Sequence, residues 1–426
     1  MGRRASLWRD FRARTGKGTD QMNTAVTFDI PPHIPRDRIV DFDIYDPPLR
    51  KSDIYQGWAS LVGDNVPELI WTPRNEGHWL PTRSTLVLEI LEDHENFSNN
   101  NVIIPKSHGE NYKVIPGFFD PPDHTPYRLA LNATLSPKVV KGIESKIRSI
   151  ASGLVDNIKD RGECEFVSDY AEILPITMFM TLMELPLEDV PQTKFWANQM
   201  FRPDGSISFE DALNNLTDYM AVHVDQRMGR SETDMLSQLI NSQINGHSLS
   251  RYEAVQIATQ VVIAGLDTVV SFLGFVFRYL ATHPELCRQL ASDLTLVPRA
   301  VDEFVRRFPI VTIGRLVRQD MSFHGVELKA GEMMAIPTMI AASDERFNKD
   351  PREVMVERIS RNILTFGAGP HLCPGRHLAR AEITVTLQEW LRRIPEFSIR
   401  SGTEPEYRAG VVSTIPSLHL VWPTSA

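Results

Sequence analysis

Residues 366–375, FGAGPHLCPG, limit the fold of this chain more than any other segment, because a stretch with helical periodicity follows directly. Gly367 and Gly369 allow positive φ angles and let the backbone pass close to a flat ligand. Pro374 and Gly375 shape a tight turn just after the sulfur of Cys373. Backbone N–H groups at the start of a helix favour an anionic sulfur and lower the pKa of its thiol. The segment therefore predicts a thiolate that faces a flat ligand.

The other cysteines offer no competing explanation. The chain has only three, Cys164, Cys287 and Cys373, far apart and without a C-x-x-C pair, which argues against a disulfide framework or a structural zinc site and suits a reducing compartment. A lone cysteine is usually a small buried hydrophobic residue. The F-G-x-G-x-H-x-C-x-G spacing before a helix is much more specific than that, so we favour a ligand.

Composition sets broad limits on the function. The 426 residues, 42% hydrophobic and 23% charged, are typical of a folded globular protein. A net charge of -9 argues against a general nucleic-acid binder. Residues 1–25 are basic and lack an apolar core, so we expect a disordered tail there and a single domain from 26 to 426.

The periodicity predicts a mainly α protein with a minor β region. Helical spacing dominates from about residue 137 to 308 and returns at 378–393, while short strands are expected near 71–85, at 315–317, 321–328 and 333–336, and in the C-terminal segment. The apolar stretch 254–281 is long enough to cross a bilayer, but polar residues are spread along it, so we predict a buried helix. Ser250 and Glu253 form a capping box at its start.

Residues 366–382, FGAGPHLCPGRHLARAE, strongly resemble the cysteine loop and following helix of bacterial cytochromes P-450, and the resemblance extends from about residue 40 to 423. It implies a helix-rich triangular prism around a buried haem b. Cys373 would be the axial iron ligand, with Phe366 and Gly375 beside the haem and dioxygen as co-substrate.

Three further motifs support this resemblance. Gly265, Asp267 and Thr268 match the oxygen-activation motif, in which Gly265 leaves room for dioxygen, Thr268 hydrogen-bonds it and Asp267 passes protons. The alternative is a simple helix break capped by Asp267. Glu303, Arg306 and Arg358 match a buried structural ion cluster. The positions that receive the haem propionates are matched by His124, Arg128, Arg315 and His371.

Within the family the chain is most similar to the camphor- and monoterpene-hydroxylating enzymes, in which a tyrosine matching Tyr112 holds the substrate ketone. The resemblance implies a substrate pocket formed by Ile103, Tyr112, Phe118, Gln260, Ile263, Ala264, Val311, Ile313, Val411 and Val412. Gln260 stands where the camphor enzyme has an aliphatic residue, and Ile313 replaces an aspartate. Ile103 is smaller than the aromatic residue expected there. We expect hydroxylation of a bicyclic monoterpene with one oxygen, such as 1,8-cineole or camphor, with ionone-like norisoprenoids next. The turn at 203–205 would join two lid helices.

The resemblance also implies the partners. A [2Fe-2S] ferredoxin with an NAD(P)H-dependent reductase would supply electrons, and Arg128, Arg376 and Arg380 could form its docking face. We expect a cytoplasmic monomer that needs neither membrane nor nucleic acid. Three alternatives stay open: a peroxygenase on the same fold, a non-catalytic haem sensor, and a haem-free helical protein.

Overall fold

A computed structural model describes residues 29–49, 53–110, 114–202, 204–230, 233–359 and 361–424. The predicted disordered tail at 1–25, and with it the start of the predicted single domain, lies outside the described residues. Within them the fold is mainly helical with a small β region, as the sequence predicts. One hydrophobic core extends from Val40 to Trp422, and a second, smaller one lies beneath the main sheet.

The helices follow the predicted order. Their bounds are α2 (Ile54–Ala59), α3 (Ser84–Glu92), α4 (Lys106–Gly109), α5 (His124–Thr134), α6 (Pro137–Ile158), α7 (Ile173–Leu182), α8 (Val190–Phe201), α9 (Phe209–Arg227), α10 (Met235–Ile240), α11 (Arg251–Gly265), α12 (Thr268–Thr282), α13 (Pro284–Ser292), α14 (Val297–Arg307) and α15 (Arg376–Arg393). A single π-helical turn, η3 (Val167–Ala171), precedes α7. Proline at the first turn of α6, α13 and α14 starts these helices where its missing N–H costs nothing.

The strands form one main sheet and three small ones. The five-stranded sheet has the order β1-β2-β10-β7-β3, and its strands are β1 (Leu69–Thr72), β2 (His78–Pro81), β3 (Phe97–Ser98), β7 (Thr312–Val317) and β10 (Met333–Pro337). The smaller sheets contain β4 (Glu163–Glu165), β5 (Gln243–Ile244), β6 (His247–Ser248), β8 (Met321–Phe323), β9 (Val326–Leu328), β11 (Ser398–Ile399) and β12 (His419–Val421). The C-terminal segment was expected to be rich in strand, but β11 and β12 are its only strands in the part described; the remainder is irregular chain packed on the core.

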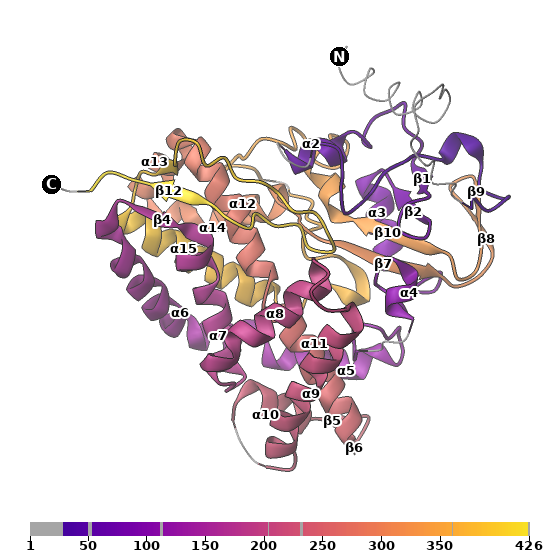
Figure 1. Cartoon of the computed structure of the whole chain (residues 1–426), viewed down its shortest axis with the longest axis horizontal. Helices are drawn as coiled ribbons and strands as arrows, with labels where there is room; N and C mark the ends of the chain where they lie inside the picture. Colours follow the sequence, from indigo (N-terminus) through magenta and orange to yellow (C-terminus); the bar gives the residue numbers. More distant parts are fainter. Residues whose placement is uncertain are drawn as a thin grey trace.

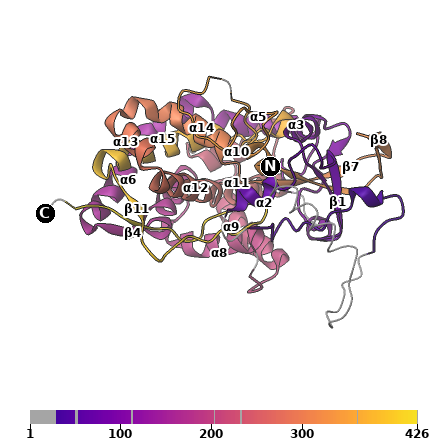
Figure 2. The same ribbon diagram turned by 90° about the horizontal axis from the view of Figure 1, so that it is seen from above.

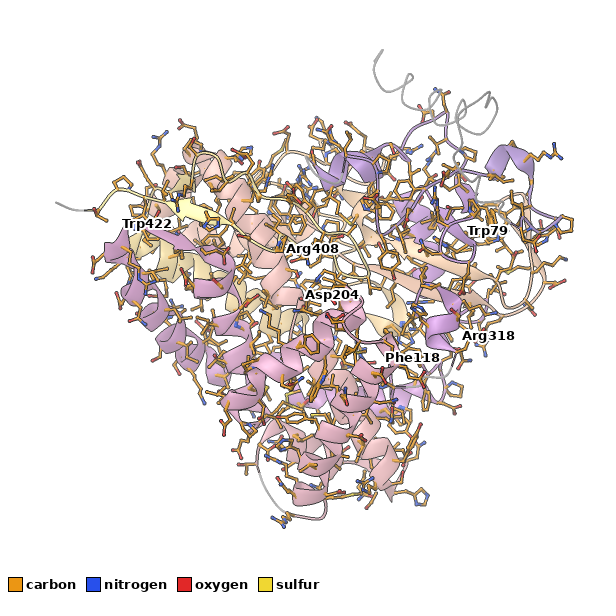
Figure 3. All side chains as sticks on the ribbon, in the orientation of Figure 1. Trp79, Phe118, Asp204, Arg318, Arg408 and Trp422 are labelled. Atoms are coloured by element: carbon orange, nitrogen blue, oxygen red, sulfur yellow. The ribbon has the colours of Figure 1, made fainter. Side chains whose placement is uncertain are left out.

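The elements form a triangular outline with the main sheet at one corner and α6, α13 and β4 toward another (Figure 1). Seen from above, α11 and α12 run between a layer containing α13, α14 and α15 and a layer containing α8 and α9 (Figure 2). The buried side chains of Trp79 and Trp422 lie at opposite ends of the molecule (Figure 3). The pair α11–α12 is therefore the central element around which the rest is arranged.

The central helix is broken in the middle. Ser250 and Glu253 form the predicted capping box at the start of α11, and the Tyr127 hydroxyl of α5 donates to the same Glu253 carboxylate. Leu266 and Asp267 separate α11 from α12. By length and composition Arg251–Thr282 could cross a membrane, but its most apolar window is 72% buried within the protein, which is typical of a core helix.

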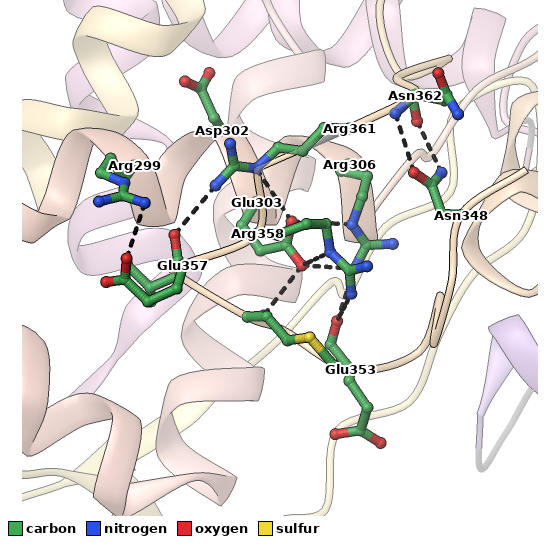
Figure 4. A network of polar contacts seen from close by, with 12 residues as sticks. Arg299, Asp302, Glu303, Arg306, Asn348, Glu353, Glu357, Arg358, Arg361 and Asn362 are labelled. Atoms are coloured by element: carbon green, nitrogen blue, oxygen red, sulfur yellow. Dashed lines mark hydrogen bonds and ion pairs between the residues drawn. The ribbon is translucent and has the colours of Figure 1, made fainter.

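A buried ion cluster ties the irregular chain before the cysteine loop to α14 (Figure 4). Glu303 has no exposed side-chain surface and accepts hydrogen bonds from Arg306 (3.0 and 2.8 Å), Arg358 (2.9 Å) and Arg361 (3.3 Å). Burial alone would raise the pKa of Glu303, but these donors and the Met355 N–H hold it below its usual value. Sequence matching named the first two arginines and missed Arg361, because no helical spacing relates it to Glu303.

Candidate active site at the cysteine loop

A largely apolar cavity of about 380 Å³ lies between the central helices and the cysteine loop. Its walls come from α5, α7, α11, α12, α14, β7, residues 365–375 and the start of α15. The predicted site residues on its lining are Arg128, Gln260, Ala264, Gly265, Thr268, Val311, Ile313, Arg315, Phe366, His371, Cys373 and Gly375. Arg128 and Gly375, which are 247 positions apart in sequence, thus meet at one site.

Cys373 lies at the floor of this cavity. Its N–H donates to the Phe366 carbonyl at 2.8 Å, and Arg376 at the start of α15 donates to the Cys373 carbonyl at 3.0 Å. Burial raises the pKa of the Cys373 thiol, although the Gly375 and Arg376 N–H groups and the Arg128 charge act to lower it. The N–H groups at the start of α15 thus act in the expected direction on this pKa, and the effect of burial outweighs them. A bound cation must supply the missing stabilisation, since metal coordination deprotonates a thiol outright.

Four cationic or donor side chains lie close to one another. Arg128, Arg315 and His371 line the cavity, and His124 packs against His371 behind its wall. The rings of His124 and His371 are 4.1 Å apart, and the buried Nε2 atom of each has no hydrogen-bond partner among the described residues. Burial lowers the pKa of His124 to about 4 and that of His371 to about 2, so both rings are neutral. Arg315 is fully buried, and Gly314 provides its only acceptor in the described part of the chain.

These unsatisfied groups test whether a haem fits the site. Buried donors without acceptors are rare in folded proteins and indicate a missing partner. Two propionates at the edge of a porphyrin would accept from His124, His371 and Arg315, and Cys373 would provide the axial sulfur. The residues present therefore fit a haem. Its propionates would accept hydrogen bonds from the unsatisfied buried side chains, and its iron would be bound by the Cys373 sulfur.

The break between α11 and α12 positions the expected oxygen-activation residues. Thr268 lines the cavity and donates to the Ala264 carbonyl at 3.3 Å. Asp267 does not cap α12 through its side chain; it forms a bidentate ion pair with Arg202 just after α8, and Ser271 donates to it at 3.2 Å. The simple capping alternative is thus not what the structure contains. Arg202 was missed, since nothing local in the sequence relates it to Asp267.

Gly265 has a packing reason to be glycine as well. A Cβ atom at this position would lie 2.4 Å from the Phe179 ring of α7. Phe179 also lines the cavity, although no periodic pattern marks it as a site residue. Any side chain at position 265 would therefore require the Phe179 ring to shift.

Other predicted pocket residues lie around the lining rather than on it. Phe118, Ile263, Val412 and His124 are buried behind the cavity wall, and Ile103 and Val411 are partly buried beside it. Val102, the neighbour of Ile103, lines the cavity instead. Tyr112 lies outside the described residues. Gln260 projects next to Gly117, where a Cβ atom would come within 2.3 Å of its Oε1 atom.

Comparison with known proteins agrees with this geometry. The sequence model of the family described as Cytochrome P450 matches residues 194–418. "Probable cytochrome P450 127A1" of Sinorhizobium fredii is 31% identical over 402 residues, covering 92% of this chain and 97% of that protein. Among solved structures, CYP101J2 is 40% identical with a TM-score of 0.87, and CYP101C1 is 34% identical with a TM-score of 0.87; each comparison covers 93% of this chain and 100% of the other.

This chain belongs to the cytochrome P450 family. It is a cytochrome P450 monooxygenase, with thiolate-ligated haem b as its cofactor and dioxygen as its co-substrate.

Proposed function

We propose that this monooxygenase hydroxylates an unactivated C–H bond of a small terpenoid that carries one oxygen atom, such as 1,8-cineole or camphor. One observation supports this substrate class above others. The substrate side of the cavity is apolar, and the amide of Gln260 forms no hydrogen bond with any described residue. A single polar group in an apolar pocket is suited to orienting a small rigid molecule.

The spacing along α11 gives this amide a defined place. Gln260 and Ala264 are four residues apart on one face of α11, roughly 6 Å from each other along the helix. Thr268, the first residue of α12, donates to the Ala264 carbonyl. A ligand oxygen held at Gln260 would leave the carbon skeleton over Ala264. The C–H bond nearest Thr268 would then be the one hydroxylated.

The remaining residues serve the chemistry that bound haem supplies, the activation of dioxygen at an iron atom held by Cys373. His124, Arg128, Arg315 and His371 would hold the propionates. Thr268 would donate a hydrogen bond toward dioxygen, and Asp267 would deliver protons when it separates from Arg202. This buried acid beside an alcohol favours reduction of dioxygen over a peroxygenase, in which peroxide brings its own protons.

We further propose that a [2Fe-2S] ferredoxin, reduced by an NAD(P)H-dependent reductase, supplies two electrons to this protein as a monomer in the cytoplasm. Arg376 and Arg380 lie next to the cysteine loop, where positive charge favours an acidic partner.

A binding experiment tests the substrate. Oxygenated terpenoids and their hydrocarbon analogues are titrated into the ferric protein, and the absorption shift that accompanies displacement of water is recorded. We expect Gln260→Leu to weaken binding of the oxygenated ligand about tenfold, as for the loss of one hydrogen bond, and to leave the hydrocarbon unaffected. Gln256→Leu, one turn earlier and outside the lining, is the matched control. Equal losses for both ligands would contradict the role of Gln260, and no shift with any terpenoid would contradict the substrate class.

A further inference from the structure

Gly117 lines the cavity from the loop between α4 and α5, and its missing side chain leaves room for another residue. Its φ angle does not fall in the left-handed region, so the backbone at this position does not require glycine. An added Cβ atom would lie 2.3 Å from Gln260 Oε1 and 3.1 Å from Gln260 Cδ, closer than van der Waals contact allows. The space beside Gly117 is therefore occupied by the Gln260 amide.

The loop that contains Gly117 is held in place by hydrogen bonds. The Asn99 side chain, which is buried, donates to the Gly117 carbonyl at 3.1 Å, and the Asn99 N–H donates to the Asp120 carboxylate at 2.8 Å. Within the loop, the Phe119 N–H donates to the Pro116 carbonyl at 3.0 Å. These bonds oppose any movement of the loop away from the cavity.

The Gln260 side chain can move more easily than this loop. It is partly exposed, while its neighbours Thr259 and Val261 on α11 are buried. Its amide is the end of a flexible side chain and forms no hydrogen bond within the part of the chain that the structure describes, so a change of rotamer breaks none. A larger residue at position 117 would therefore displace the amide and leave both the loop and α11 in place.

We propose, on the basis of the substrate role proposed above for Gln260, that Gly117 is a positioning residue for substrate specificity. Its missing side chain fixes the rotamer of the Gln260 amide. The place of that amide decides where the substrate oxygen is held, and hence which carbon atom lies nearest Thr268. A substitution at position 117 would therefore change specificity through Gln260.

The main alternative is that Gly117 only makes room for a bulky substrate. A substitution would then weaken the binding of all ligands of one shape equally, whether or not they contain oxygen. If Gly117 acts through Gln260, the loss concerns the ligand oxygen alone, and it vanishes when residue 260 has no amide. A double-mutant cycle distinguishes the two roles, because it measures how far the effect of one substitution depends on the other.

The cycle compares Gly117→Ala, Gln260→Ala and the double variant as ferric holoenzymes. Camphor and bornane, its oxygen-free analogue, are titrated, and the absorption shift on displacement of water gives each affinity. We expect Gly117→Ala to weaken camphor binding about tenfold, as for one lost hydrogen bond, and bornane binding by less than about twofold. In the Gln260→Ala background the same substitution should change neither affinity. Gly153→Ala of α6 is the control and should have no effect, because an added Cβ atom there meets nothing within 4 Å.

A second test needs no ligand. The crystal structure of the ligand-free Gly117→Ala holoenzyme should contain the Gln260 amide in a rotamer that differs from that of the wild type, with residues 114–120 unmoved. Its melting temperature should be close to that of the wild type, because only a flexible side chain has to move. An unchanged Gln260 rotamer, or a loop that has moved instead, would overturn the proposal.

The binding data can overturn it independently. Equal losses for camphor and bornane would indicate a merely steric role, and so would an undiminished loss in the Gln260→Ala background. If Gly117→Ala alone does not fold, folding of the double variant is the rescue that the proposal predicts, and failure of both contradicts it. If no terpenoid binds the wild type, the substrate proposal fails by itself. The cycle is then measured with another cyclic ketone that displaces water, and the rotamer test is unaffected.

Discussion

At the scale of single residues, Cys373 is the group on which the chemistry depends. Burial opposes ionisation of its sulfur, while three nearby donors or charges favour it, and the net pKa is raised. A bound iron atom would therefore favour deprotonation of the Cys373 thiol, and the resulting thiolate would coordinate the iron. The loop around it leaves little freedom, since Thr365 also donates to the Val305 carbonyl of α14.

Replacing Cys373 should remove the axial thiolate. We expect Cys373→Ala to lose the absorption band characteristic of the thiolate-bound, carbon-monoxide-bound reduced protein. Cys287→Ala, at a buried cysteine whose sulfur contacts only the Pro395 carbonyl among hydrogen-bond acceptors, should keep the band. An unchanged spectrum in Cys373→Ala would refute the ligand assignment.

Sequence reasoning at this scale succeeded where a residue belongs to a local pattern. Cys373, His371 and Gly375 share one loop, and Gln260 and Thr268 are close in sequence on the two halves of the central helix, so their common location in the cavity was predictable. Arg202 and Arg361 were missed because their partners are distant in sequence. Glu382 is buried and also lines the cavity, and it was missed because a glutamate on a helix is usually solvent-exposed.

At the scale of elements, the Glu303 cluster joins α14 to the chain that leads into the cysteine loop. Its carboxylate is the only anion facing Arg306, Arg358 and Arg361 in the described part of this cluster. Removing it leaves buried positive charge uncompensated, which is far more costly than losing a surface pair.

We expect Glu303→Gln to lower the free energy of unfolding by about 3–5 kcal/mol and to release haem on mild heating. Arg299→Gln, which breaks the exposed pair with Glu357, should cost no more than about 1 kcal/mol. Denaturant titration followed by haem absorbance measures both. Equal, small effects would contradict a structural role for the cluster.

The pH dependence of this cluster has a definite sign. The folded pKa of Glu303 is below its unfolded value, so its stabilisation is present above the unfolded value and is lost as pH falls through the folded one. The start of α11 was predicted well because its capping box and its periodicity agree, and α15 was predicted from periodicity alone. The C-terminal segment was overestimated as strand, because extended apolar chain packed on a core resembles a strand in sequence.

At the scale of the whole molecule, the net charge of -9 contrasts with the arginines beside the cysteine loop. Arg380 pairs with the half-exposed Asp302 and stacks 4.6 Å from the Phe366 ring, and Arg376 holds the loop carbonyl. A local basic face on an acidic protein can direct an acidic partner to this side.

Reduction by a [2Fe-2S] ferredoxin should therefore slow steeply as salt is added. We expect Arg380→Gln to lower the low-salt reduction rate severalfold, and Arg36→Gln, exposed on η1 (Arg36–Arg38) near the sheet, to have no effect. Stopped-flow reduction at several ionic strengths measures both. Salt-independent rates would argue against docking at this face.

The hydrogen bond from Tyr127 to Glu253 has a consequence that reaches well beyond the start of α11. It joins α5, the helix that contains His124 and Arg128, to α11, the helix that contains Gln260 and Ala264. The helix that would bind the haem propionates and the helix that would orient the substrate are thus linked by one hydrogen bond, and neither Tyr127 nor Glu253 lines the cavity. Substitution of Tyr127 or Glu253 should therefore change which carbon atom is hydroxylated, although every side chain that lines the cavity is unchanged.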